Sequence, residues 1–158
     1  MVQPASIIIR QAAGRDLIAV ERLLEANKLP LVGVRDGIDD FLIAERDGSI
    51  VGVIGLEIYD DRGLLRSAAV DTDERGTGVG AALVGALIAN ARARELKELV
   101  LLTTTAERWF PRFGFATIAR HEAPVAVKGS AEFTGACPAS ATVMRLTLES
   151  APTDGVAR

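Results

Sequence analysis

Hydrophobic positions recur along this chain with two spacings, one typical of strands and one of helices. Residues 6–12 are short and rich in β-branched side chains, which predicts a first strand. Residues 16–30 place leucine and valine three and four positions apart, as in a helix that buries one face, and the pattern ends before Pro30. The chain is therefore expected to begin with a strand followed by an amphipathic helix.

Residues 41–70 are predicted to form three consecutive strands. Asp47 and Gly48 separate the first from the second, and Asp-Gly between apolar runs is a strong hairpin signal. Residues 60–63 supply a second turn of the same polar character. This part of the chain is therefore expected to be a three-stranded antiparallel meander.

The rest of the chain alternates between helical and strand patterns. Residues 78–94 have a helical pattern, and residues 98–102 include the apolar run expected of a strand buried in a parallel sheet. A short helix and two more strands are predicted at residues 106–114, 115–120 and 140–148. The order β-α-β-β-β-α-β-α-β-β predicts an α/β (α+β) fold with a mixed sheet and helices on its faces.

Composition and charge limit what such a domain can do. The chain has 158 residues, of which 49% are hydrophobic and 25% charged, with a net charge of −3. This length favours one domain, expected over residues 6–148 with flexible ends at 1–5 and 149–158. A slightly acidic chain carries no basic footprint, so no nucleic-acid partner is expected.

The sequence also favours a cytoplasmic setting. A single cysteine cannot form an internal disulfide, which fits a reducing compartment. The longest apolar run, residues 79–89, is shorter than the roughly 18 residues that a membrane span needs. The N-terminal residues lack the pattern of a signal peptide. No membrane partner is therefore expected.

The candidate for chemistry is the glycine-rich segment RGTGVG, residues 75–80, which opens the second long helix. It admits three interpretations: a tight turn, a dinucleotide fingerprint or an anion cradle. The dinucleotide fingerprint would follow its strand directly and be paired with an acid after the next strand, whereas here five residues intervene after Val70 and threonines stand at 103–105. A P-loop is excluded because no lysine follows the glycines.

An anion cradle satisfies the physical requirements at this position. The first N–H groups of a helix have no intrahelical partner, and the helix dipole adds partial positive charge there. Glycines let a diphosphate lie against those amides, and Arg75 supplies a countercharge. The expected ligand has a diphosphate but no ribose that an acidic side chain must bind. Coenzyme A fits that description.

Two motifs then show a specific resemblance. The segment V70-D71-x-x-x-R75-G76-x-G78-x-G80 resembles the Q/R-x-x-G-x-G/A signature of the GCN5-related N-acetyltransferase (GNAT) superfamily. The segment A106-x-x-W109-F110-x-x-F113-G114-F115 is similar to the second motif of that superfamily. The resemblance covers residues 6–148 and implies a mostly antiparallel, seven-stranded GNAT-like sheet flanked by helices on both faces.

Finer features resemble two groups within the superfamily. Residues 102–115 look like the acetyltransferase domain of N-acetylglutamate synthases, and residues 132–144 like small acetyltransferases of arsenic-resistance operons. Both groups imply acetylation of an amino acid's α-amino group, on glutamate or a glutamate-like toxic analogue. No amino-acid-kinase domain of the kind that many full-length synthases carry is expected here, and the GACPAS segment lacks an arginine where those synthases have basic residues. The sequence leaves open whether the protein forms a homodimer.

The resemblance implies a binding site for acetyl-CoA as co-substrate. The sheet is expected to splay between the strand before the loop and the strand at residues 99–104, and the backbone of Val70 to polarise the thioester carbonyl. The residues implied to bind the cofactor are Ala68, Ala69, Val70, Arg75, Gly76, Thr77, Gly78, Val79, Gly80, Trp109 and Phe110. No metal is expected, since one histidine and one cysteine cannot anchor a site.

The residues that would move protons depart from the superfamily's pattern. Phe110 stands where many relatives place a tyrosine acid, and Leu64 where many place a glutamate. Glu57, on an apolar strand, is a candidate base, and the competing interpretation is an ion pair with Arg66 across the hairpin. Ordered water is the third possibility. His121, the sole histidine, is expected at the surface.

Three side chains are candidates for substrate recognition, and a fourth is an alternative to one of them. Arg66 offers a planar fork for a carboxylate, with Arg35 as an alternative. Thr103 and Thr104 are candidate substrate contacts, although a threonine before a helix more commonly caps it. The sequence thus predicts an N-acetyltransferase acting on a small amine, most specifically an amino acid. The alternative is an acyl-CoA-binding sensor without turnover.

Overall fold

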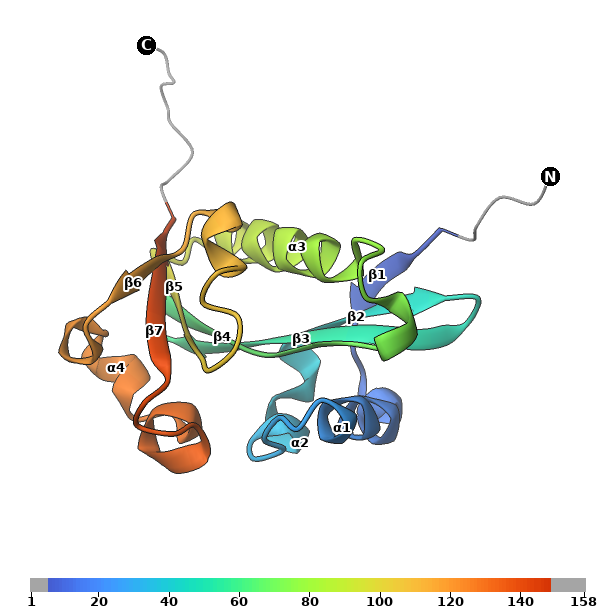
Figure 1. The fold of residues 1–158 in the computed structure, drawn as a ribbon, viewed down its shortest axis with the longest axis horizontal. Helices are drawn as coiled ribbons and strands as arrows, with labels where there is room; N and C mark the ends of the chain where they lie inside the picture. The colour runs from blue at the N-terminus through green and yellow to red at the C-terminus, as the bar shows by residue number, and fades with distance from the viewer. Residues whose placement is uncertain (1–5, 149–158) are drawn as a thin grey trace, which may run out of the picture. The chain divides into compact units, whose positions relative to one another are not determined.

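The computed structural model describes residues 6–148, so the flexible ends predicted at 1–5 and 149–158 lie outside the described residues. Seven strands form one sheet in the order β1-β2-β3-β4-β5-β7-β6 (Figure 1). The strands are β1 (Ile8–Gln11), β2 (Phe41–Arg46), β3 (Ser49–Tyr59), β4 (Arg62–Val70), β5 (Glu98–Thr103), β6 (Ala116–Ile118) and β7 (Thr142–Thr147). The predicted mixed seven-stranded sheet is confirmed.

The turns within the meander follow the sequence pattern. β2 and β3 are joined by Asp47 and Gly48, both with positive φ, 54° and 80°. This is the backbone that a two-residue hairpin turn requires, and Asp-Gly adopts it readily. β3 and β4 are joined by Asp60 and Asp61, and Asp60 has a φ of 57°.

The chain divides into two compact units. Among the described residues, the first unit consists of 6–56 and 66–87, and the second of 57–65 and 88–148. The expectation of a single domain over 6–148 stays a prediction.

The first unit buries its core between the sheet and two helices, α1 (Leu17–Ala26) and α2 (Val34–Gly37). Phe41 and Ile43 of β2 and Val20 and Leu24 of α1 are fully buried in one cluster. Burying a side chain of this size contributes about 1.5–3 kcal/mol. The phenyl ring of Phe41 crosses Gly55 of β3 so closely that an added Cβ would collide with it.

The first turns of α3 (Val79–Ala93) lie on the other face of the sheet in this unit (Figure 1). A Cβ added at Gly52 of β3 would come within 2.8 Å of Leu83 and 2.9 Å of Val79. The missing side chain at Gly52 therefore lets the start of α3 lie close against the sheet.

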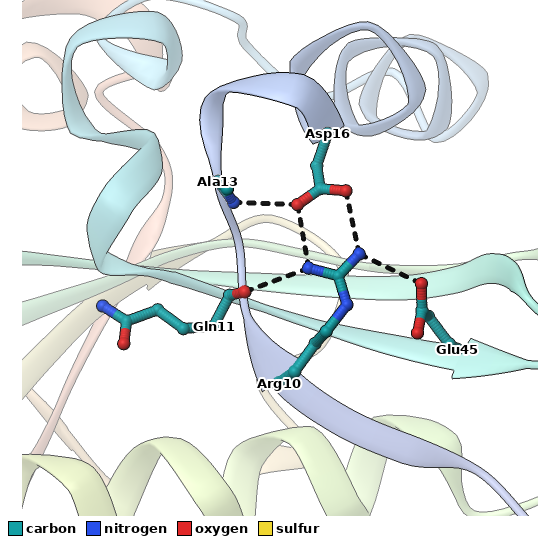
Figure 2. A network of polar contacts seen from close by, with 5 residues as sticks. All are labelled: Arg10, Gln11, Ala13, Asp16 and Glu45. Carbon is teal, nitrogen blue, oxygen red and sulfur yellow. Dashed lines mark hydrogen bonds and ion pairs between the residues drawn. The ribbon is translucent and has the colours of Figure 1, made fainter.

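A polar network fixes the beginning of α1 to the sheet edge (Figure 2). The Arg10 guanidinium on β1 donates to both carboxylate oxygens of Asp16, at 3.0 and 2.9 Å, and to Glu45 of β2 at 3.0 Å. The Asp16 carboxylate also accepts from the backbone N–H of Ala13 at 2.8 Å. These hydrogen bonds hold the pKa of Asp16 below its usual value, the contact with Arg10 having the largest effect.

The second unit has its own core around the antiparallel pairing of β5 with β7. Leu64, Val100, Ala123, Val127 and Val143 form its buried cluster. Several partly buried hydrophobic side chains pack against this cluster, namely Tyr59, Leu102, Ile118 and Phe133.

Short helical segments depart from the prediction. The short helix expected within 106–114, interrupted or started near Pro111, is a single 3-10 turn, η4 (Phe110–Phe113). It begins beside this proline, which has no N–H to donate to a helix that would start earlier. Between β6 and β7 the structure adds η5 (Arg120–Glu122), α4 (Val125–Lys128) and the π-type turn η6 (Glu132–Ala136). Segments of three to five residues are too short to show helical periodicity, so the sequence pattern missed them.

Candidate functional site

The glycine-rich loop leads directly into α3, as the anion-cradle interpretation expects. Gly76 and Gly78 have φ values of 82° and 91°, which L side chains rarely adopt. Nothing lies within 4 Å of the position that a Cβ would occupy at either residue. Val79 is the first residue of α3. The loop thus combines a glycine-dependent backbone with open space beside the N-terminus of a 15-residue helix.

A glutamate before the loop holds it in shape. Glu74 accepts a hydrogen bond from Arg46 Nε of β2 at 3.0 Å, and both side chains are largely buried. The Thr77 hydroxyl donates to the backbone carbonyl of Glu74 at 2.6 Å and lies 3.1 Å from its carboxylate. The role of Glu74 could not be predicted from the sequence pattern, because its partner Arg46 lies 28 residues away along the chain.

Arg75 is tied to the end of the first helix. Its Nη2 donates to the Asn27 side-chain oxygen at 2.6 Å, and Asn27 in turn donates to the Leu23 carbonyl at 2.9 Å. Asn27 directly follows α1. The guanidinium of Arg75 is therefore exposed but held at a defined place beside the loop.

The strand before the loop contains a kink that the sequence did not predict. Ser67 of β4 has a φ of 59°, in the left-handed region, and is 7% exposed. Its hydroxyl accepts a hydrogen bond from Arg66 Nε at 2.9 Å. After this kink Ala68 is exposed, whereas Ala69 is buried. A non-glycine residue in this conformation costs of order 1 kcal/mol, and such strain is often found at functional sites.

Within the second unit, the parallel pairing of β4 with β5 is short. It runs from Arg62 opposite Glu98 to Leu64 opposite Val100, whereas β5 stays paired with β7 as far as Thr103. The splay expected from the resemblance beyond this ladder stays a prediction, and so does the cleft itself.

Glu57 and Tyr59 form a pair on β3 in the second unit. The Tyr59 hydroxyl donates to Glu57 Oε1 at 2.5 Å, a charge-assisted hydrogen bond between side chains on one face of the strand. Tyr59 is the only tyrosine of the chain, and no sequence motif indicated a role for it. Leu64, at the position where many relatives have a glutamate, is fully buried.

The threonines after β5 divide into two roles. Thr103 Oγ1 accepts from the backbone N–H of Ala106 at 2.9 Å, which is the local turn-capping use of threonine. Thr104 is exposed and follows the end of β5. The capping alternative raised for Thr103 is thus observed, and a substrate contact by either residue stays a prediction.

Trp109 and Phe110 belong to an aromatic cluster in the second unit. Phe110 is 5% exposed and packs edge-on against Trp109 at 5.0 Å and Phe115 at 5.7 Å between ring centroids. Trp109 is half-buried, with the Arg112 guanidinium 5.5 Å from its ring centroid. The cluster gives Phe110 a structural role, and cofactor contact by these rings stays a prediction.

The candidate residues fall into two groups. The first unit brings together Arg66, the backbone of 68–70 and the loop 75–80, and the second holds Glu57, Thr103, Thr104, Trp109 and Phe110. The ion pair expected between Glu57 and Arg66 stays a prediction. Arg66 itself is 2% exposed, deeper than a surface carboxylate receptor would be.

The remaining polar candidates have local explanations. His121 is exposed, as expected. The Cys137 thiol donates to the buried carboxylate of Glu132 at 3.2 Å. Between residues 6 and 148, no group of three His, Cys, Asp or Glu side chains is placed to hold a metal ion. Nor does this described part of the chain contain a helix with the length and apolarity of a membrane span.

The fold defines a class of protein, namely acyltransferases that use coenzyme A. The family model described as "Acetyltransferase (GNAT) domain" matches residues 37–117. The chain belongs to this GNAT acetyltransferase family, so it transfers an acetyl group from acetyl-CoA to an amine.

Two curated relatives are both named amino-acid acetyltransferase. An amino-acid acetyltransferase of Mycobacterium tuberculosis is 32% identical over 121 residues, which cover 70% of this chain and 69% of the relative. An amino-acid acetyltransferase of Ralstonia nicotianae is 41% identical over 80 residues, covering 49% of this chain but only 18% of the relative. The chain therefore spans about a fifth of the length of such longer relatives.

Solved structures show the same fold with the cofactor. The structure of Rv2747 from Mycobacterium tuberculosis in complex with CoA has a TM-score of 0.78 and 27% identity, covering 90% of this chain and 99% of that one. N-acetylglutamate synthase from Neisseria gonorrhoeae, complexed with coenzyme A and N-acetyl-glutamate, has a TM-score of 0.79 and 25% identity, covering 94% of this chain and 36% of that one.

Proposed function

We propose that this protein acetylates the α-amino group of an amino acid, with acetyl-CoA as the donor. The observation that carries the proposal is the loop 75–80, where positive-φ glycines leave open space beside the start of α3. Its oriented amides suit a diphosphate. The named relatives support an amino acid as acceptor, since each is an amino-acid acetyltransferase.

The strand before the loop would hold the reactive end of the donor. The backbone of residues 68–70 follows the kink at Ser67 and lies beyond the stretch of β4 that pairs with β5. Its N–H and C=O groups are suited to bind the amides of the pantetheine arm, like an added strand. The N–H of Val70 would stabilise the oxyanion that develops on the thioester carbonyl.

The reaction is a direct transfer. The neutral amine attacks the thioester carbon, the new N–C bond forms, the C–S bond breaks, and CoA leaves as its thiol. The amine proton must go to a base, and Glu57 with its hydrogen-bonded Tyr59 is the candidate for that step. Ordered water is the alternative route. Phe110 offers no proton to the departing sulfur, so that proton would come from solvent.

The finer identity of the substrate is also a proposal. The resemblance of the C-terminal segment to acetyltransferases of arsenic-resistance operons suggests a glutamate-like toxic analogue in place of glutamate. The absence of arginine from the GACPAS segment is the sequence feature that supports this choice. A cytoplasmic setting is proposed with it, because the chain has a single cysteine.

One experiment separates the enzyme from the sensor alternative. Purified protein is mixed with acetyl-CoA and a panel of amino acids, glutamate analogues and simple amines, and release of free thiol is followed. Amine-dependent release with amino acids above simple amines of equal length is expected. If CoA binds by calorimetry and no amine in the panel releases thiol, the proposal of catalysis fails and the sensor stands.

A further inference from the structure

A hollow lies in the second unit, in the segment between β6 and β7. It has a volume of about 530 Å³ and is lined by Arg120, His121, Lys128 and Phe133. Three short segments supply these residues, η5, α4 and η6. A volume of this size falls within the range of small-molecule sites and exceeds what a single inorganic ion fills.

The two fixed cations of this hollow are partly buried and face neutral acceptors. Lys128 Nζ donates to the His121 carbonyl at 3.0 Å. Arg120 donates to the carbonyls of Ala139 and Phe133, each at 3.3 Å. Among residues 6–148, no carboxylate forms an ion pair with Arg120 or Lys128. In the described part of the chain, the two positive charges of the hollow therefore have no carboxylate within ion-pair distance.

The two acids nearest to the hollow along the chain, Glu122 and Glu132, already have partners. The buried Glu132 carboxylate accepts from the Cys137 thiol at 3.2 Å. The Glu122 carboxylate accepts from the backbone N–H of Ala119 at 2.7 Å, closing the turn of η5. Partial burial of a cation without an anion costs free energy, whereas the carbonyl contacts only orient the two groups. An oxyanion placed in the hollow would meet charge-assisted donors that are already held in position.

The Phe133 ring makes the hollow suited to an anion that also has an apolar part. The Arg120 guanidinium carbon lies 5.2 Å from the centroid of the Phe133 ring, so the ring supports one face of the guanidinium. The guanidinium has five N–H donors, and the two carbonyl contacts leave three of them for a ligand. The half-buried ring also gives the hollow an apolar wall.

We propose that this hollow is a binding site for a small organic acid, in which Arg120 and Lys128 bind a carboxylate and Phe133 contacts the carbon chain. The ligand comes either as a free dicarboxylate or as the side chain of an amino acid. Both sources present the same carboxylate to the same pair of cations.

The test uses the full chain and glutarate, a five-carbon dicarboxylate without an amine. Titration by calorimetry, and by amide NMR shifts of residues 120–133, is expected to show saturable binding. Lys128→Gln should weaken it about tenfold or more, because it removes a charge-assisted contact. Arg22→Gln is the matched control, since Arg22 is exposed on α1 and lies outside the hollow. This control should leave the affinity unchanged.

A second variant and two further ligands test whether the binding depends on Arg120 and on a carboxylate. Arg120→Lys keeps the charge but loses the planar fork, and weaker binding in a folded variant supports the assignment of Arg120. Cadaverine, a diamine with the same five carbons, should not shift the same amides. Glutamate binding as tightly as glutarate points to an amino-acid side chain as the source, and tighter glutarate points to a free acid. Absence of glutarate binding, or binding insensitive to Lys128→Gln, overturns the proposal.

Discussion

Arg10 and Asp16 are joined by two parallel hydrogen bonds, Nη1 to Oδ2 at 3.0 Å and Nη2 to Oδ1 at 2.9 Å. The Asp16 side chain is 6% exposed and that of Arg10 27%. This bidentate pair links an edge strand to the residue just before α1, and it also fixes the backbone turn at Ala13. The start of α1 is therefore held by electrostatics as well as by its apolar face.

The first prediction concerns the pH dependence of stability. Because the pKa of Asp16 is lower in the folded protein than in the unfolded chain, the pair stabilises the fold above about pH 4, and this contribution is lost as pH falls through the lowered pKa. Asp16→Asn should lower the free energy of unfolding by about 2 kcal/mol at pH 7. Urea unfolding between pH 7 and pH 3 measures this effect.

The same series contains its control. Asp16→Asn should weaken the acid dependence of stability, whereas Glu25→Gln, at an exposed position on α1, should leave it as in the parent. Equal acid dependence in the parent and in Asp16→Asn would contradict the prediction.

The second prediction separates backbone strain from ligand contact in the glycine-rich loop. Gly78→Ala places a methyl group in open space at a φ of 91° and should cost about 1–2 kcal/mol of stability. Gly48→Ala imposes the same kind of strain in the β2–β3 turn, also in open space, at a φ of 80°. Only Gly78→Ala should also weaken CoA binding in calorimetry. Equal CoA affinity in the two variants would contradict the prediction that this loop binds the diphosphate.

The third prediction treats Glu74 as a positioning residue. Glu74→Gln removes a negative charge near the loop, which by charge alone would strengthen the binding of an anionic cofactor. It also loses the ion pair with Arg46, which holds the loop. If positioning dominates, the Michaelis constant for acetyl-CoA should rise by up to about fivefold. A fall in this constant would show that Glu74 acts only as a charge.

The fourth prediction concerns the acceptor's carboxylate. Arg66→Met should raise the Michaelis constant of the amino acid about tenfold or more, because a charge-assisted contact is lost, and should leave that of acetyl-CoA unchanged. A simple amine without a carboxylate should be used equally poorly by both forms. If the variant only loses stability, the buried Arg66 serves the kink at Ser67, and Arg35 becomes the next candidate.

The sequence predicted the strands and the loop well for identifiable reasons. The Asp47-Gly48 turn and the long apolar runs are local signals, and local signals decide hairpins and buried strands. The kink at Ser67 was missed because serine gives no sign of positive φ. The roles of Glu74 and Tyr59 were missed because they depend on side-chain partners that the spacing along the chain does not reveal. The hollow depends on residues brought together from three turns, each too short to be recognised.

The contact of Phe41 with Gly55 has a consequence for how this family of sequences can vary. A Cβ at position 55 would overlap the phenyl ring, whose Cε1 and Cε2 atoms would each lie 2.7 Å away. Neither residue can therefore be exchanged for a larger one without a change in its neighbour. Among homologues, a side chain at position 55 should be accompanied by a smaller residue at position 41. The two positions should therefore covary so that the combined volume of their side chains stays about constant.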